Sequence, residues 1–412
     1  MLIFLVFSPS VFGYFVKRDH GDPFRCPKNW IQTFNEVQKG YSLVKNGNRK
    51  EAQILLAETA RLAFLDLPKA FECSIGISAL FRILAHAHVV RPQVALRMMH
   101  VSMNWLTHAF VKKGLNEGRW VDESSWPITI QEINDEETYI QQQIGAQGDT
   151  PVWPDCPLDY KDPNLRIGIV TMCDYPADNP LPALSMSNKY IYANRHGYTV
   201  IEERERTDKS RPHAWAKITL MEKHINRTDL DWLLWFDCDT YFMNLNITLD
   251  HVLHKFGGGE KMDSEFFMLI QEDHAMLNTG VFFMKTGQQS AQLLNKVYGE
   301  KDSPWIDHPW WENAAFSHLF LGDLPSRVRE GDEGMKGIYP LGVRVAPQEL
   351  FNSYHPVTSR IFMHDTWEEG KFVLAFSGCV SGSSPTVTQM LYVNYYRIMC
   401  EINNVKNECI DV

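Results

Sequence analysis

The chain has 412 residues, of which 44% are hydrophobic and 22% are charged. This length suits two domains, and this composition is typical of a globular protein, which argues against a disordered chain, a collagen or a coiled coil. The chain carries 40 lysines and arginines against 50 aspartates and glutamates, a formal net charge of −10. An acidic chain without a long basic run is a poor candidate for a nucleic-acid partner.

The amino terminus is apolar over residues 1–16. This segment is too short for a membrane-spanning helix, which needs about 20 residues. It resembles the apolar part of a signal peptide, with Gly13 near a cleavage point, and the alternative is a buried strand. Eight cysteines and the sequons at Asn226 and Asn246 suit an oxidising lumen. We therefore expect a glycoprotein located in the lumen of the secretory pathway (ER or Golgi) or secreted.

Residues 27–144 are predicted to form a helical domain. Apolar residues recur at three- and four-residue spacing in 52–63 and again in 78–85, as on one face of a helix. The pattern around Gly40 is similar to one tetratricopeptide unit, without a second copy in register, and an ordinary helical bundle is the alternative. Such a domain is a candidate binding site for a protein partner. The glycine- and proline-bearing segment 145–156 is predicted to be a linker.

From residue 157 to 412 the pattern changes to alternating strands and helices. Short apolar, β-branched runs predict strands, and longer segments with helical periodicity lie between them. The predicted strands are 166–172, 196–202 and 232–237, and the predicted helices are 184–194 and 214–225. This alternation predicts an α/β sandwich with a mainly parallel central sheet. Ligands of such sheets bind at the carboxyl ends of the strands.

The strand predicted at 232–237 ends in two acidic residues, Asp237 and Asp239. Residues two apart on a strand point to the same side, so both carboxylates are expected at one edge of the sheet. Two carboxylates on a buried strand end repel each other and lose hydration. A divalent cation relieves both penalties, and hard oxygen ligands suit Mn²⁺ or Mg²⁺. The alternative is an ordinary loop with two acidic residues.

Several blocks of the sequence together resemble a known enzyme family. These blocks are His196–Tyr198, Trp215–Lys217, Trp232–Asp239, Leu277–Phe283 and Phe376–Cys379. In order and spacing they resemble the galactosyl, mannosyl and xyloglucan-xylosyl transferases of glycosyltransferase family 34, over residues 166–379. The resemblance implies a GT-A fold, a UDP- or GDP-sugar donor and a Mn²⁺ ion. It also implies a glycan or glycoprotein acceptor and retention of configuration, which gives an α-linked product.

The resemblance also assigns roles to individual residues. Those implied to bind the donor are Thr171, Lys217, Asp237, Asn278, Thr279 and Gly280. Those implied to act in catalysis are Glu312, Asn313 and Gln271. The metal ligands implied are Asp237 and Asp239. Glycine lets the backbone approach the sugar, and an asparagine amide can bond its hydroxyls.

One position departs from the family. Ala375 stands where the family has a metal-ligating histidine, and alanine cannot bind a metal. His364 is the nearest candidate replacement, although a hydrogen-bonded surface histidine is the alternative. The chain could therefore be a non-catalytic protein with a GT-A-like fold that binds carbohydrate or a partner. The intact Asp237 and Asp239 favour the enzyme.

Aromatic residues precede Glu312. Trp310 and Trp311 are equally compatible with stacking on a sugar ring and with packing, whereas Trp305 is predicted to pack.

Overall fold

The structure is a computed structural model that describes part of the chain. The described residues are 30–63, 78, 80–85, 102, 155–176, 178–257, 259, 262, 264–271, 277–308, 310–322, 342–346, 348–356, 366–377 and 385–411. The chain divides into two compact units, Met1–Thr150 with Leu321–Ile338, and Pro151–Phe320 with Tyr339–Val412. The predicted signal segment 1–16 lies outside the described residues.

The first unit contains a helical hairpin of α2 (Trp30–Lys45) and α3 (Arg49–Ala63). Gly40 lets the helices approach, because a Cβ atom at this position would overlap the side chain of Leu56. Gly47 lies in the connecting turn with a φ of 83°, a conformation that favours glycine. Most of the predicted helical domain lies outside the described residues, so its extent and its linker stay predictions.

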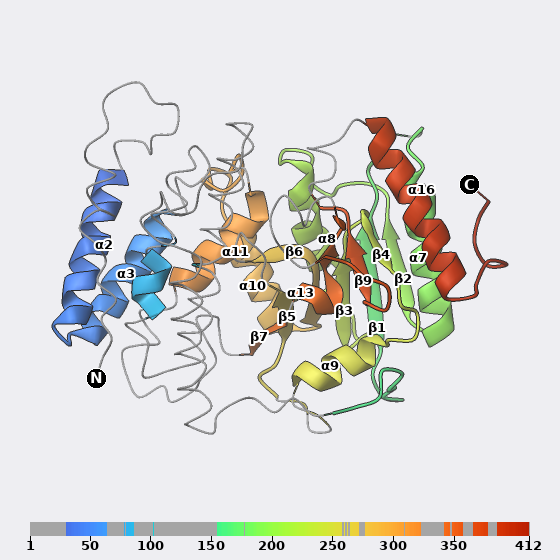
Figure 1. Cartoon of the computed structure of the whole chain (residues 1–412), viewed down its shortest axis with the longest axis horizontal. Coiled ribbons are helices and arrows are strands. Elements are labelled where there is room, and N and C mark those ends of the chain that lie inside the picture. The colour runs from blue at the N-terminus through green and yellow to red at the C-terminus, as the bar shows by residue number, and fades with distance from the viewer. Residues whose placement is uncertain are drawn as a thin grey trace. The chain divides into compact units, whose positions relative to one another are not determined.

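The second unit is built on a six-stranded sheet with the order β2-β1-β3-β6-β5-β7 (Figure 1). Its strands are β1 (Ile167–Met172), β2 (Thr199–Glu203), β3 (Trp232–Phe236), β5 (Met268–Gln271), β6 (Asn278–Lys285) and β7 (Val343–Ala346). The pairs β1–β2, β1–β3 and β5–β7 are parallel, and β6 is antiparallel to both β3 and β5. The predicted α/β fold of GT-A type with a mainly parallel sheet is confirmed.

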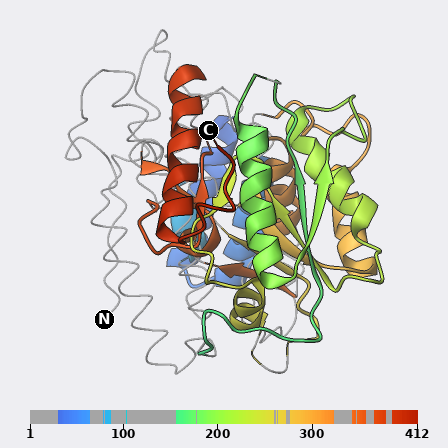
Figure 2. The same cartoon turned by 90° about the vertical axis from the view of Figure 1, so that its right-hand side faces the viewer.

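Helices and a second, smaller sheet complete this unit. The helices are α7 (Leu181–His196), the 3₁₀ turn η3 (His213–Trp215), α8 (Ala216–His224), α9 (Leu249–Gly257), α10 (Gln288–Tyr298), α11 (Trp311–Gly322), α13 (Gln348–Phe351) and α16 (Pro385–Ile402). The small sheet has the order β4 (Thr240–Phe242), β9 (Val373–Ala375), β8 (Ser353–Tyr354). Helices α7 and α16 lie side by side in both views (Figures 1 and 2).

Strand β3 is buried along its whole length, and its side chains alternate between two packed layers, one on each face of the sheet. Trp232, Leu234 and Phe236 belong to a core cluster that also contains residues of α7, α9, α16 and the small sheet. The side chain of Trp235 lies on the opposite face of the sheet, beneath α8, with the Lys217 ammonium 5.9 Å from its ring. The period of two therefore directs Asp237, the next residue on this face, toward α8.

The strands and helices predicted for this unit are found close to their predicted bounds, with small shifts at their ends. The helix predicted at 184–194 extends over Leu181–His196, because Pro182 suits its first turn and Gly197 ends it with a φ of 73°. The helix predicted at 214–225 begins with η3 and continues as α8.

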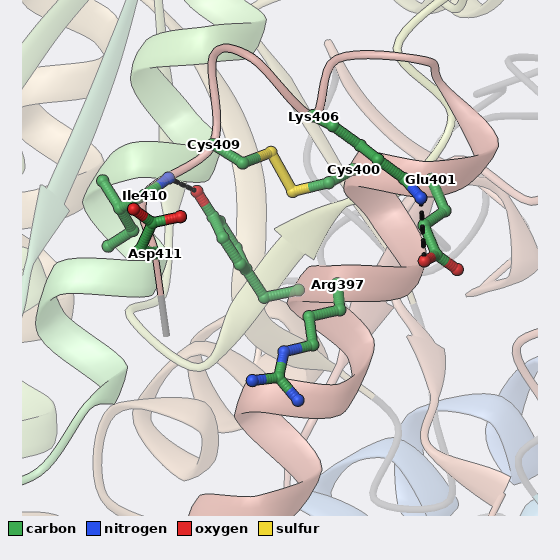
Figure 3. Close-up of a pocket in the computed structure, with 8 residues that line it drawn as sticks. Arg397, Cys400, Glu401, Lys406, Cys409, Ile410 and Asp411 are labelled. Carbon is green, nitrogen blue, oxygen red and sulfur yellow. Dashed lines mark hydrogen bonds and ion pairs between the residues drawn. A yellow bond between two sulfur atoms is a disulfide. The ribbon is translucent and has the colours of Figure 1, made fainter.

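Two disulfides join described cysteines of the second unit. Cys173–Cys238 joins the end of β1 to the segment after β3, and Cys400–Cys409 closes the turn after α16. A surface pocket of about 200 Å³ lies at this turn (Figure 3), with Lys406 paired to Glu401. Its lining includes no predicted site residue. Among the helices described here, none is both long and apolar enough to span a membrane.

Candidate active site

Asp237 and Asp239 follow β3 directly, at the carboxyl end of this strand. The Asp237 backbone N–H donates to the Gly280 carbonyl of β6 at 2.9 Å. Its carboxylate accepts a hydrogen bond from the Trp235 indole N–H at 2.6 Å, and its side chain is 27% exposed. The Asp239 carbonyl accepts the Phe376 N–H at 2.9 Å. Both acidic residues are thus fixed by their backbone at the predicted edge of the sheet.

Asp239 is half-buried and lies close to another negative charge. Burial and the Asp237 carboxylate raise the pKa of Asp239 to about 6, against the opposing effect of Lys217. Lys217 therefore relieves the repulsion between the two carboxylates only in part. Two oxygen-rich side chains with unrelieved negative charge fit a hard divalent cation such as Mn²⁺ or Mg²⁺.

Lys217, on α8, joins two acidic side chains that are far apart in the sequence. Its ammonium lies 3.3 Å from both carboxylate oxygens of Asp237 and 3.1 Å from Oε1 of Glu312, and the residue is only 6% exposed. It also donates to the Thr279 carbonyl at 3.0 Å. Burial lowers the pKa of Lys217, but the two carboxylates outweigh this effect and raise its pKa above the ordinary value. The ammonium therefore stays charged.

Glu312 and Asn313, in the first turn of α11, contact the start of β6. The Thr279 N–H donates to Oδ1 of Asn313 at 2.9 Å, and the Thr279 hydroxyl lies 2.8 Å from Oε1 of Glu312. Glu312 is 1% exposed, and burial raises its pKa while Lys217 lowers it. Its second oxygen, Oε2, is buried and has no hydrogen-bond partner in the described part of the chain. Lys217 and Thr279 therefore hold Oε1 of this carboxylate, whereas Oε2 forms no described hydrogen bond.

The remaining predicted donor residues lie beside this cluster. Gly280 donates its N–H to Oδ1 of Asn278 at 2.7 Å, and Gln271 donates from Nε2 to the Asn278 carbonyl at 3.2 Å. The structure thus brings together eight of the predicted residues from β3, β5, β6, α8 and α11: Asp237, Gln271, Asn278, Thr279, Gly280, Lys217, Glu312 and Asn313. Thr171, near the end of β1, is fully buried, and no described residue forms a hydrogen bond with its hydroxyl.

The position of the missing family histidine is well defined. Ala375 is fully buried in β9, pairs with Thr240 across the small sheet, and accepts the His355 N–H at 2.9 Å. The His355 ring stacks on Phe376, and burial lowers its pKa to about 4, so this ring is neutral. His364 lies outside the described residues. In the described part of the chain, no group of three or more His, Cys, Asp or Glu side chains is arranged to hold a metal.

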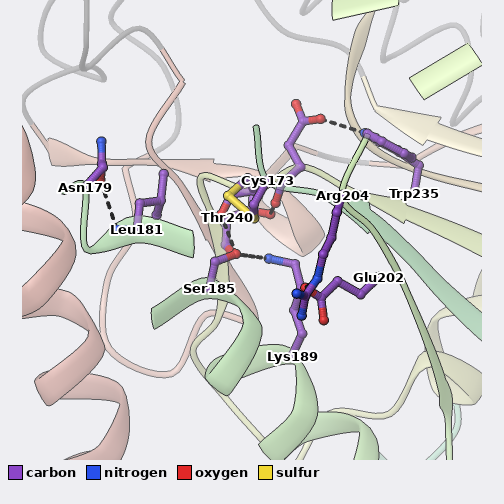
Figure 4. Close-up of a disulfide and its surroundings, with 11 residues drawn as sticks. Cys173, Asn179, Leu181, Ser185, Lys189, Glu202, Arg204, Trp235 and Thr240 are labelled. Carbon is purple, nitrogen blue, oxygen red and sulfur yellow. Dashed lines mark hydrogen bonds and ion pairs between the residues drawn. A yellow bond between two sulfur atoms is a disulfide. The ribbon is translucent and has the colours of Figure 1, made fainter. Parts of the chain in front are cut away.

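Lys189 was not identified from the sequence. This lysine of α7 is fully buried and donates to the Thr240 carbonyl at 3.2 Å and to the Ser185 hydroxyl, which donates to the Cys238 carbonyl at 2.6 Å. Figure 4 shows both side chains reaching toward the segment that carries the Cys173–Cys238 disulfide. Burial lowers the pKa of Lys189 to about 7, against the opposing effect of Asp239. Helical periodicity, which places Ser185 and Lys189 on one face, is the signal that could have found them.

The aromatic residues before Glu312 differ in exposure. Trp305 is buried, as predicted for packing. Trp311 is 39% exposed and has a φ of 41°, which is unusual for a bulky residue. For Trp310 and Trp311, stacking on a sugar ring and packing both stay predictions.

Comparison with known proteins places this region in context. Residues 167–257 match the galactosyl transferase GMA12/MNN10 family, a segment that contains β1, Lys217 and both acidic residues after β3. The resemblance to glycosyltransferase family 34 is confirmed. The matched segment ends before Asn278 and Glu312, so the roles of these residues rest on geometry and on the blocks quoted above.

Three similar proteins illustrate the relationship. An uncharacterised alpha-1,2-galactosyltransferase of Schizosaccharomyces pombe is 24% identical over 174 residues, which cover 34% of this chain and 46% of the relative. A probable alpha-1,6-mannosyltransferase MNN10 of Saccharomyces cerevisiae is 25% identical over 184 residues, with 36% and 47% covered. A solved glycosyltransferase involved in glycosylation of the major capsid of PBCV-1 aligns with a TM-score of 0.41 and 15% identity, covering 56% of this chain and 99% of that structure. The chain spans less than half the length of the Schizosaccharomyces pombe and Saccharomyces cerevisiae relatives.

Proposed function

We propose that the chain is a retaining glycosyltransferase. It moves a hexose or pentose from a UDP- or GDP-sugar to a hydroxyl of a glycan or glycoprotein and forms an α-linkage. The observation that supports this most is the cluster in which Lys217 contacts Asp237 at 3.3 Å and Glu312 at 3.1 Å. It combines a buried cation, acidic side chains at a strand end and the family match in one place.

The donor diphosphate is proposed to bind beside Asp237 and Asp239. These two carboxylates would hold Mn²⁺ or Mg²⁺, and such an ion, when bound, supplies positive charge for the leaving diphosphate. Lys217 holds the Asp237 carboxylate in place and adds a fixed positive charge beside it. The Thr171 hydroxyl, which has no hydrogen-bond partner among the described residues, is proposed to contact the nucleotide at the end of β1.

The sugar is proposed to lie against the start of β6 and the first turn of α11. Lys217 and Thr279 hold one oxygen of Glu312, which leaves its other oxygen for the sugar. Glu312, Asn313 and Gln271 would stabilise the positive charge that develops on the sugar ring. The acceptor hydroxyl attacks on the face that the diphosphate leaves, and its proton passes to the departing phosphate oxygen.

A second candidate function is non-catalytic binding of carbohydrate or of a protein partner. It is favoured by one observation: Ala375 is fully buried at the position of the family histidine. For either function we propose the lumen of the secretory pathway as the location, and a protein partner for the amino-terminal helices.

Donor hydrolysis separates the two functions. The purified chain is incubated with UDP-galactose, GDP-mannose or UDP-xylose, with Mn²⁺, with Mg²⁺ or with a chelator, and nucleoside diphosphate release is measured. We expect release from at least one donor, lost in Asp239→Asn and retained in Asp229→Asn, a change at an exposed acid that pairs with Arg227. Diphosphate release that is equal in wild type and Asp239→Asn would contradict the proposed function.

A further inference from the structure

We propose that Asn352 is a further sugar-binding residue of the donor site. Its amide would bond hydroxyls of the transferred sugar within a polar cradle formed around Gly280 by Asp237, Asn278 and Asn352. This inference rests on the proposed function and adds a residue from the segment between α13 and β8.

Gly280 marks the floor of the cradle. A Cβ atom at Gly280 would lie 2.9 Å from Oδ1 of Asn278, 3.3 Å from Oδ2 of Asp237 and 3.8 Å from Oδ1 of Asn352. Three polar side chains from separate segments therefore converge on one Cα atom that has no side chain of its own. Glycine is required here, because a Cβ atom would collide with Oδ1 of Asn278, and without one the three side chains can approach the backbone closely.

Asn352 is buried without using its amide. The residue is 0% exposed, and neither Oδ1 nor Nδ2 has a hydrogen-bond partner among the residues that the structure describes. Its backbone is fixed, since its N–H donates to the Gln348 carbonyl at 2.9 Å and its carbonyl accepts from Nε2 of Gln348 at 3.2 Å. A buried amide without partners is costly, which makes it a candidate for a missing ligand.

Asn188 is a buried asparagine with a purely structural role, and its hydrogen bonds provide a comparison for Asn352. It is equally buried, donates from Nδ2 to the Phe242 carbonyl at 2.9 Å and accepts the Phe242 N–H at 2.8 Å. Near the cradle the pattern differs, because Oε1 of Gln271 and Oε2 of Glu312 are also buried without a hydrogen-bond partner among the described residues. Unpaired polar atoms therefore gather around the proposed sugar position.

The chemistry of the cradle fits an uncharged, hydroxyl-bearing ligand. An asparagine amide offers one acceptor oxygen and two N–H donors, and each sugar hydroxyl can both donate and accept. Asp237, at the edge of the cradle, is also the proposed anchor of the diphosphate. This shared residue favours the donor sugar over the acceptor sugar as the occupant.

Asn352→Leu tests the assignment, because leucine has a similar size and lacks the amide. Isothermal titration with Mn²⁺ present measures dissociation constants for UDP and GDP and for UDP-galactose, GDP-mannose and UDP-xylose. For the preferred donor we expect the variant to lose about tenfold or more in affinity, with diphosphate affinity unchanged within about twofold. The melting temperature of the free protein should stay the same or rise, because no hydrogen bond of the amide is lost.

Asn188→Leu is the matched control. It should lower the melting temperature, because two buried hydrogen bonds are lost, and leave the ratio of sugar-nucleotide to diphosphate affinity unchanged. If Asn352→Leu does not fold, Asn352→Ala is measured in the same way.

Three results would overturn the assignment. One is an unchanged affinity ratio in the Asn352 variant, as expected if the amide only binds water or the acceptor sugar. Another is an equal loss of diphosphate and sugar-nucleotide affinity. A third is failure of the wild type to bind any of these nucleotides, which overturns the proposed function as well and is visible before any variant is made.

Discussion

Replacing Lys217 by methionine removes the cation that lies between two acidic side chains. Glu312 is 1% exposed and loses its ion pair of 3.1 Å, while Asp237 loses a contact of 3.3 Å. Removing one partner of a buried ion pair typically costs about 3–5 kcal/mol, because the other charge stays buried and uncompensated. We expect Lys217→Met to lower the free energy of unfolding by about this amount.

Denaturant unfolding with a chelator present measures this loss. Lys223→Met is the matched control on the same helix, because Lys223 pairs with Glu203 at 2.7 Å but its side chain is 52% exposed. Exposed ion pairs contribute about 0–1 kcal/mol, so this control should unfold almost as the wild type does. The double variant Lys217→Met with Glu312→Gln should recover part of the stability, because the amide removes the unpaired charge. The reasoning is refuted if Lys217→Met costs no more than Lys223→Met.

Three further predictions concern the residues around this cluster. Asp239→Asn should raise the melting temperature of the metal-free protein at pH 8, because a carboxyl whose pKa is raised to about 6 destabilises the fold once it is ionised; a lower melting temperature in a thermal scan would contradict this. Gly280→Ala should weaken sugar-nucleotide binding in titration calorimetry, since its Cβ would lie 2.9 Å from Oδ1 of Asn278, and unchanged binding would show that the cradle is not occupied. His355, with a pKa lowered to about 4, should make the fold less stable as the pH falls from about 6.5 to 4, because the unfolded chain then binds a proton that the folded ring does not, whereas Asp239, with a pKa raised to about 6, acts in the opposite direction. Unfolding curves across this range should show His355→Phe gaining stability relative to the wild type as the pH falls, and a stability difference that does not change with pH would count against this explanation.

Much of the second unit could be predicted because its signals are local. The strand predicted at 232–237 is found at Trp232–Phe236, where it is fully buried, and the two acidic residues follow at its end. The resemblance to a family supplied Lys217 and Glu312, whose ammonium and carboxylate lie 3.1 Å apart across 95 positions of sequence. Spacing alone gives no reason to connect them.

Other features depend on long-range contacts that the sequence does not reveal. Lys189 is buried only because α7 packs its Ser185 face against the segment after β3. The sequence does not single out Asn352, because only the structure shows its amide beside Gly280 without a hydrogen-bond partner among the described residues. The pairing of Cys173 with Cys238 also follows from the parallel alignment of β1 and β3, which brings the ends of these strands together.

Location of bound Mn²⁺ tests the central claim most directly, namely that the cluster around Lys217, Asp237 and Glu312 is a nucleotide-sugar site. Crystals grown with Mn²⁺ and UDP or GDP would give the position of the ion from its anomalous scattering and that of the nucleotide from its density. We expect the ion against Asp237 and Asp239, with the diphosphate beside it and the nucleotide extending toward the end of β1. A well-occupied nucleotide and Mn²⁺ bound elsewhere on the protein, with Asp237 still paired only to Lys217, would contradict the account.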